Sequence, residues 1–195
     1  MALPATDNFN RANAANLGAN WTAQAGNMQV TSNEIGANGA SSSTENGVYW
    51  NADTFGNDQY SQVIAASVES YAGAGAACRI ATNTDDSWYG FYSDTSYLYF
   101  FKMVSGTWTS IDSDSTPAST SDVIKIDAEG TTITGYRNGS SQATNTDSAL
   151  ASGAAGVTSW GDGVGTTVDD WEGGNLGSPP ADIYSILPAF RTVRA

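Results

Sequence analysis

Short strand-like runs alternate with polar turns along most of this chain, and no apolar run keeps the 3.6-residue period of a helix over three turns. Strand-like runs are expected instead at residues 47–50, 59–69, 76–81, 87–92, 97–103, 108–112, 122–128, 131–137, 154–160 and 166–171. Turns rich in Gly, Asn, Asp and Ser separate them about every 8–12 residues, which is typical of a sandwich or jelly roll. The sequence therefore predicts an all-β fold, a two-sheet antiparallel β-sandwich.

Two dipeptides, Glu129-Gly130 and Asn138-Gly139, are the clearest hairpin turns in the sequence. The strand before the first turn carries Ile124 and Ile126 two positions apart. Because alternate strand residues share a face, both are expected in the core, with the polar residues between them on the other side.

Two stretches near the ends of the pattern resemble a known family. The first is Asp7-Asn8-Phe9-Asn10-Arg11 with Leu17-Gly18-Ala19-Asn20-Trp21, and the second is Val168-Asp169-Asp170-Trp171. Together they resemble the opening and closing strands of the concanavalin A-like, LamG-type jelly rolls, in their bacterial and phage branch. The resemblance implies that these strands lie close together and that residues 1–172 form one jelly-roll domain. It implies no single activity, because this fold carries lectins, hydrolases and structural modules.

The character of the sequence changes after Trp171. Residues 173–180 read as a linker rich in Gly and Pro, and residues 181–195 are apolar and end with two Arg residues. The segment 173–195 is therefore expected to be a linker and a C-terminal docking arm, with Ile183, Tyr184, Ile186, Leu187 and Phe190 as its docking residues. Two interpretations stay open: the arm folds back over its own sheet, or it docks on a neighbouring subunit.

Charge narrows the range of partners. The chain has a net charge of −13, with only 7 Lys and Arg against 20 Asp and Glu. Nucleic-acid binding depends on clustered cationic residues, so a nucleic-acid partner is not expected. The acidity either keeps the protein soluble or serves cation binding. Charged residues make up only 14% of the chain, which favours a virion or extracellular surface as the location.

The absence of His and the single Cys78 exclude most zinc sites and both Ser-His-Asp and Cys-His catalysis. No apolar stretch approaches the roughly 20 residues that a membrane span needs, so no membrane insertion is expected. The first residues lack a secretory signal pattern. Either a signal was removed or the protein leaves the cell within a particle released by lysis, and the Met-Ala start favours the second.

A glycoside hydrolase is the enzyme class that this fold suggests first. Retaining hydrolysis needs two carboxylates about 5–5.5 Å apart, and related glucanases supply them from a cluster on one strand. The five Glu residues here are isolated at positions 34, 45, 69, 129 and 172, and no such cluster is present in the sequence. The prediction is that the protein is not an enzyme.

The pair Asp169-Asp170 is expected to place one carboxylate inwards, near the opening stretch. One interpretation is an ion pair of Asp169 or Asp170 with Arg11. A second is a calcium site built from Asp7, Asp169 and Asp170, because calcium prefers hard oxygen ligands. Ligand binding is the third. No cofactor is otherwise expected.

Residues 88–101 carry an unusual density of aromatic side chains. If the segment forms a hairpin around residues 93–96, one set of rings fills the core and the other lies on the outer sheet face. Rings on an outer face indicate a glycan, a protein neighbour or simple cross-strand pairing. The expected carbohydrate-binding residues are Trp88, Tyr92, Asp94, Tyr97, Tyr99 and Trp108.

These observations favour a non-catalytic structural or adhesion module. The predicted role is a surface, decoration or tail-associated protein of a phage-like particle, with protein neighbours in an assembly and a cell-surface glycan as a further partner. The alternative is a free carbohydrate-binding module or lectin of a larger secreted protein. A glycoside hydrolase ranks third.

Overall fold

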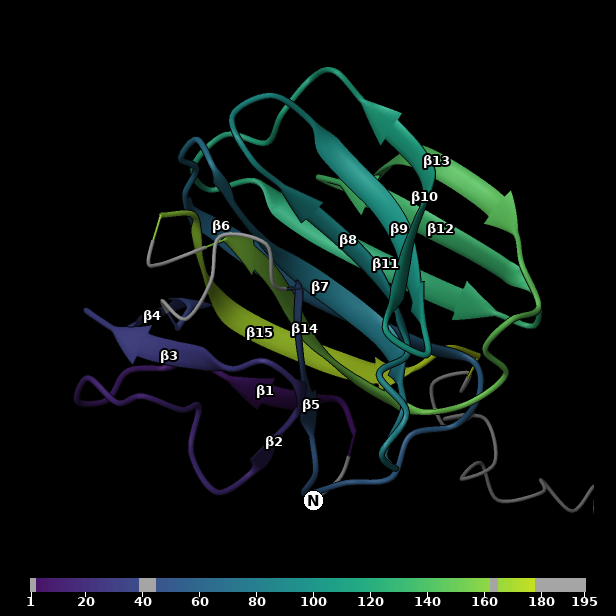
Figure 1. The fold of residues 1–195 in the computed structure, drawn as a ribbon, viewed down its shortest axis with the longest axis horizontal. Helices are drawn as coiled ribbons and strands as arrows, with labels where there is room; N and C mark the ends of the chain where they lie inside the picture. The colour runs from purple at the N-terminus through teal and green to yellow at the C-terminus, as the bar shows by residue number, and fades with distance from the viewer. Residues whose placement is uncertain (1–2, 39–44, 162–164, 178–195) are drawn as a thin grey trace, which may run out of the picture.

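The computed structural model describes residues 3–38, 45–161 and 165–177, and the account below concerns these residues. Within them the chain forms fifteen β-strands and no helix, as the alternating pattern predicts (Figure 1). No helix long and apolar enough to cross a membrane occurs in this part of the chain.

The strands form two antiparallel sheets. The first sheet has eight strands in the order β13-β12-β11-β6-β15-β4-β3, with β1 paired to β15. Its strands are β1 (Ala5–Asp7), β3 (Met28–Thr31), β4 (Glu34–Ala37), β6 (Gln59–Ser67), β11 (Val123–Glu129), β12 (Thr132–Arg137), β13 (Ser140–Thr146) and β15 (Thr167–Asn175).

The second sheet has seven strands in the order β10-β9-β8-β7-β14-β5-β2. Its strands are β2 (Trp21–Ala25), β5 (Glu45–Trp50), β7 (Ala72–Ile80), β8 (Trp88–Ser93), β9 (Leu98–Val104), β10 (Thr107–Asp114) and β14 (Ala154–Gly161). The two sheets pack face to face as the predicted sandwich. All ten strands expected from the sequence are present. Strands β2, β3, β4 and β13 were missed, because β2 and β3 alternate over only five and four residues and β4 and β13 show no clear alternation.

Both predicted hairpin turns are confirmed. Gly130 joins β11 to β12, and Asn138-Gly139 joins β12 to β13 with φ values of 51° and 77°. Two consecutive residues with positive φ define the turn that best matches the twist of paired strands, which is why Asn-Gly is favoured there.

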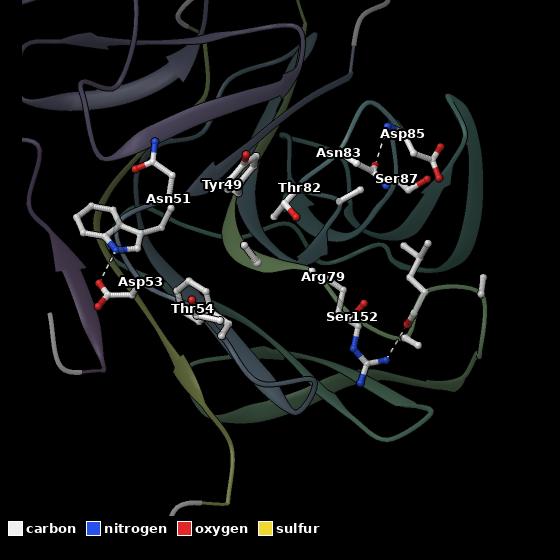
Figure 2. Close-up of a pocket in the computed structure, with 18 residues that line it drawn as sticks. Tyr49, Asn51, Asp53, Thr54, Arg79, Thr82, Asn83, Asp85, Ser87 and Ser152 are labelled. Carbon is white, nitrogen blue, oxygen red and sulfur yellow. Dashed lines mark hydrogen bonds between the residues drawn. The ribbon is translucent and has the colours of Figure 1, made fainter.

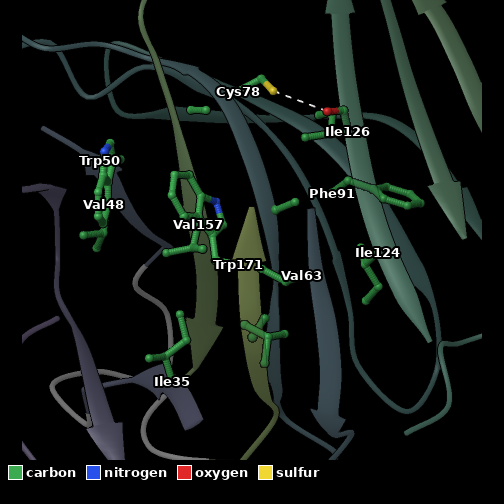
Figure 3. Packing of buried hydrophobic residues seen from close by; sticks show 14 of the residues in the cluster. Ile35, Val48, Trp50, Val63, Cys78, Phe91, Ile124, Ile126, Val157 and Trp171 are labelled. Carbon is green, nitrogen blue, oxygen red and sulfur yellow. Dashed lines mark hydrogen bonds between the residues drawn. The ribbon is translucent and has the colours of Figure 1, made fainter. Parts of the chain in front are cut away.

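The main core lies between the sheets (Figure 3). Ile124 and Ile126 of β11 point into it, as predicted, and face Phe91 of the other sheet. Cys78 is fully buried there, and its thiol donates to the carbonyl of Ile126 at 3.4 Å. The lone cysteine is therefore a small core residue, and burial raises the pKa of its thiol.

The opening and closing strands lie side by side, as the resemblance implies. Strand β1 pairs with β15 so that Asp7 lies opposite Trp171 (Figure 1). Trp171 also contacts Trp21 and Trp50 of the other sheet, with ring centroids 4.7 and 5.3 Å away. Each ring buries on the order of 200 Å², worth up to about 5 kcal/mol. This tryptophan cluster therefore joins the first and last strands of the described residues to both sheets.

The expected ion pair between Arg11 and Asp169 or Asp170 is wrong. Arg11 instead makes two 2.8 Å hydrogen bonds to Asp7, four residues earlier. Asp170 is exposed with φ 48°, in a segment where the pairing of β15 with β6 shifts register. This bulge breaks the alternation that was expected to turn one of the two carboxylates inwards.

The domain boundary expected at residue 172 is also too early. Strand β15 continues to Asn175, whose side chain accepts a hydrogen bond from the Gly56 amide at 2.7 Å. The predicted docking residues between Ile183 and Phe190 lie outside the described residues.

Candidate functional site

The seven-stranded sheet carries aromatic side chains on both faces, as predicted for the hairpin of β8 and β9. Tyr89 and Phe91 point into the main core, whereas Trp88 and Tyr92 belong to a second apolar cluster on the outer face. The hairpin closes through the Asp94 amide, which donates to the Tyr97 carbonyl at 3.1 Å. Strand alternation alone accounts for this division.

Glycines create the space in which the outer rings lie. A Cβ at Gly73 of β7 would stand 2.5 Å from the ring of Tyr92, and one at Gly90 would stand 2.3 Å from the ring of Phe101. Both distances are shorter than real contacts allow, so these rings lie directly on the backbone of the sheet. The result is a rigid floor in which Trp88 and Phe101 have no exposed surface.

A pocket of about 320 Å³ lies on this floor, and it is lined by Glu45, Tyr92, Tyr99, Trp108 and Trp160. Tyr97 adjoins it, because its ring centroid is 5.6 Å from that of Tyr99. We call these five aromatic residues together with Glu45 the aromatic groove. Trp108 and Tyr97 are 40% and 42% exposed, which leaves two ring surfaces open to a ligand.

Ring-to-ring contacts hold the groove in shape. Tyr92 lies 5.2 Å from Tyr99 and 5.1 Å from Phe101, and Phe101 stacks on Trp108 at 5.9 Å. Such contacts are worth about 0.5–1.5 kcal/mol each beyond the buried area. Trp108 therefore rests on the buried ring of Phe101 and Tyr97 on the partly buried ring of Tyr99, so that both need little reordering when a ligand binds.

Asp94 acts at the turn and does not line the pocket. Its carboxylate accepts the amides of Ser96 and Tyr97 at 2.6 and 2.9 Å, and the hydroxyl of Tyr99 at 3.2 Å. Asp94 therefore shapes the turn that presents Tyr97 and orients the ring of Tyr99. Burial, together with the neighbouring Asp94 carboxylate, raises the pKa of Tyr99 to about 12.

Glu45 is the acidic residue among those that line the pocket. Its Oε1 accepts a hydrogen bond from the Tyr92 hydroxyl at 3.2 Å, and its Oε2 is buried without a partner among the described residues. Burial raises the pKa of Glu45 to about 8, and the hydrogen bond from Tyr92 offsets only part of that shift. Glu45 is thus a neutral carboxylic acid at pH 7.

Of the predicted carbohydrate-binding residues, the structure brings Tyr92, Tyr97, Tyr99 and Trp108 together in the groove. The prediction is wrong for Trp88, whose ring is fully buried and whose Nε1 donates to Thr158 at 3.2 Å. Sequence reasoning missed Glu45 and Trp160, which lie directly opposite each other on β5 and β14. Their only sequence signal was a lone Glu two residues before one expected strand and a Trp at the end of another.

A second, larger pocket of about 650 Å³ lies at one end of the strands and is mainly polar (Figure 2). Its polar side chains come from three loops, which contribute Asn51 and Thr54 after β5, Thr82 and Asn83 after β7, and Ser152 before β14. We call it the strand-end pocket.

Buried Arg79 lines the strand-end pocket and stabilises its wall. Its guanidinium donates to the carbonyls of Asn57, Gly130 and Leu150 at 2.8–3.0 Å, which ties three loops together. The Arg79 guanidinium is therefore occupied by hydrogen bonds to the protein's own backbone. Tyr49 is the partly exposed ring in this pocket, so it offers a ligand less stacking surface than the aromatic groove does.

The three carboxylates expected to bind calcium do not form a metal-binding group. The Asp7 carboxylate already accepts hydrogen bonds from Arg11, from the Trp21 indole at 2.8 Å and from the Phe9 amide at 2.9 Å. These donors lower the pKa of Asp7 despite its burial. In the described part of the chain, no three His, Cys, Asp or Glu side chains lie close enough together to hold a metal ion.

Solved structures that resemble this chain share its fold. They include the carbohydrate-binding module CBM66 from Bacillus subtilis, with a TM-score of 0.60 and 18% identity over 77% of this chain and 91% of that one. A β-1,3-1,4-glucanase (lichenase) from a mouse hindgut metagenome has a TM-score of 0.57 and 10% identity over 88% and 98% of the two chains. The Ca²⁺-bound luminal domain of VIP36 has a TM-score of 0.54 and 12% identity over 84% and 86%.

The chain therefore has the concanavalin A-like jelly-roll fold. At these identities the likeness establishes the fold and not the activity, and the similar structures include both binding modules and an enzyme. No protein-family model matches the chain, and no curated protein matches it in sequence.

Glu45 predicts a pH dependence of stability. Its pKa in the folded protein lies above its ordinary value of 4.5, so the folded state binds more protons than the unfolded state between about pH 4.5 and 8. Stability should therefore fall as the pH rises through that window, by up to about 1.4 kcal/mol per pH unit. Glu45→Gln should remove this part of the slope, measured by urea unfolding at pH 5, 6, 7 and 8.

Glu129→Gln is the matched control, because Glu129 is exposed at the end of β11 in the other sheet. It removes the same charge and should leave the slope as it is. Equal slopes for wild type and Glu45→Gln would show that the Glu45 carboxyl is not desolvated.

Proposed function

We propose that this protein is a non-catalytic glycan-binding module whose ligand lies in the aromatic groove. The observation that carries the proposal is the pair of half-exposed rings, Tyr97 and Trp108, which lie against the partly buried ring of Tyr99 and the fully buried ring of Phe101 on an outer sheet face. Sugars present apolar C–H faces that stack on such rings, while a few polar groups fix their orientation. The groove offers both kinds of contact.

The carboxyl groups at the aromatic groove support binding over hydrolysis there. Glycoside hydrolysis needs two carboxyl groups flanking the scissile bond, at about 5–5.5 Å or 6.5–9.5 Å from each other. The pocket is lined by one carboxyl, that of Glu45, and the Asp94 carboxylate is engaged at the turn. The name of CBM66 describes a carbohydrate-binding module, whereas the lichenase is an enzyme. The fold is therefore compatible with both roles.

Substitutions in the aromatic groove should weaken glycan binding without unfolding the protein. Tyr97→Ala and Trp108→Ala each remove a half-exposed ring, and we expect each to lower affinity by about twofold to tenfold, given about 0.5–1.5 kcal/mol per stacking contact. A glycan array would identify the ligand, and calorimetry would give the affinities. Tyr71→Ala, which removes a 79% exposed ring on the loop between β6 and β7, should change neither affinity nor stability.

The proposal fails if the groove variants bind the same glycans as tightly as wild type does. A loss that instead follows Thr82→Ala or Asn83→Ala would place the ligand in the strand-end pocket.

The setting that we propose for the module is the surface of a phage-like particle, as a decoration or tail-associated protein. The low content of charged residues, 14%, and the apolar C-terminal segment support this setting. The alternative is a module of a larger secreted protein. Both settings place the protein at a virion or extracellular surface.

Removal of the C-terminal segment separates the two settings. The described sandwich is complete at Asn175, so a chain ending at Gly177 should keep its melting temperature. If the segment docks on a neighbour, the shortened chain should remain monomeric where the full chain assembles, as measured by light scattering. A lower melting temperature would show that the segment covers its own sheet, and an unchanged assembly state would contradict the docking role.

A further inference from the structure

The charge around the aromatic groove restricts which glycans it can accept. Four aromatic side chains and the Glu45 carboxyl line the pocket, and no Lys or Arg is among the lining residues that the structure describes. Lys102 is a cation on the neighbouring strand β9, but it pairs with Asp147. The net charge of the chain is −13. Anionic glycans such as uronic acids would therefore meet repulsion without a compensating contact.

Glu45 is an unusual residue for a groove that only stacks sugars. One of its carboxyl oxygens accepts from Tyr92, and the other is buried with no partner in the described part of the chain. A buried carboxyl without an opposing charge costs stability, and the hydrogen bond from Tyr92 offsets only part of this cost. A carboxyl that is buried without an opposing charge at a binding surface is a candidate for ligand recognition.

We propose that the aromatic groove selects glycans with a free, positively charged amino group, and that Glu45 is the residue that recognises this group. The ligand class is an amino sugar whose nitrogen is not acetylated. This inference rests on the proposed function and names the ligand of the same site.

Three features of the groove suit such a ligand. The negative charge of an ionised Glu45 carboxylate suits the positive charge of an ammonium group. The ammonium group in turn supplies the opposing charge that Glu45 does not have in the free protein. The faces of Trp108 and Trp160 attract a cation as well as the apolar face of a sugar ring. The net negative charge of the protein raises the local concentration of a cationic polymer. In the free protein burial keeps Glu45 protonated at pH 7, so a bound ammonium group takes the place of that proton.

The test uses oligosaccharides that differ in one substituent. Hexamers of glucosamine, N-acetylglucosamine and glucose share a backbone, as do the corresponding galactosamine, N-acetylgalactosamine and galactose hexamers. Calorimetry at pH 6 and about 0.15 M salt, where surface charges are largely screened, should give an affinity at least about tenfold higher for an amino hexamer than for its acetylated and hydroxyl counterparts. Glu45→Gln should reduce this ratio to about one.

Glu129→Gln is the matched control, because it removes one exposed carboxylate from the other sheet and should keep the tenfold ratio. A wild-type ratio near one, or an equal drop in both variants, would overturn the role of Glu45 as the selecting residue. Such a result would leave the module itself intact, because glycans would still bind. Failure of the wild-type protein to bind any glycan on an array would overturn the proposed function instead.

Discussion

The seven-stranded sheet depends on small residues beneath its aromatic rings. Strand β7 consists of Ala, Gly and Cys up to Arg79, and a Cβ at Gly75 would stand 2.1 Å from the carbonyl oxygen of Phe91. Gly75 lets strands β7 and β8 approach each other, and Gly73 and Gly90 leave room for the rings of Tyr92 and Phe101 to lie flat on the sheet. Because they do lie flat, one sheet has an aromatic core on its inner face and an aromatic floor on its outer face.

That floor positions the groove and the acid at its end. Tyr92 extends across the glycine positions of β7 and reaches Glu45, which lies three strands away in the sheet order. The contact joins residues 47 positions apart in sequence. Trp160 lies on β14, between β7 and β5, and is directly opposite Glu45. The carboxyl of Glu45 and the ring of Trp160 therefore lie at the same edge of the groove. The site is thus built on strands of the scaffold, which hold side chains more precisely than loops do.

Much of the fold follows from local rules in the sequence. Strand-like runs separated by turns predict the sandwich and ten of its strands, Asn138-Gly139 predicts a hairpin, and the double-faced aromatic hairpin follows from period-2 alternation. The resemblance of the opening and closing strands correctly implies that β1 lies beside β15. These features could be predicted because each depends on residues that are neighbours in sequence or on a short motif.

Other features depend on geometry that a single sequence does not contain. The bulge at Asp170 breaks the alternation that seemed to bury an acid, and Arg11 prefers the carboxylate four residues away over a distant one. Trp88 is on the expected face, yet Thr158 and the neighbouring rings cover it completely. Glu45 and Trp160 become neighbours only through the register of β5 and β14, and alternation fixes a residue's face but not its partner across strands.

The six tryptophans allow a direct measurement of where a glycan binds. Each indole N–H gives its own signal in a nitrogen–proton NMR spectrum, so a titration with a bound oligosaccharide reports on each ring separately. The account predicts that the signals of Trp108 and Trp160 shift, whereas those of Trp21, Trp50 and Trp171 in the main core stay in place. Shifts confined to the loops of the strand-end pocket, with Trp108 and Trp160 unchanged, would contradict it.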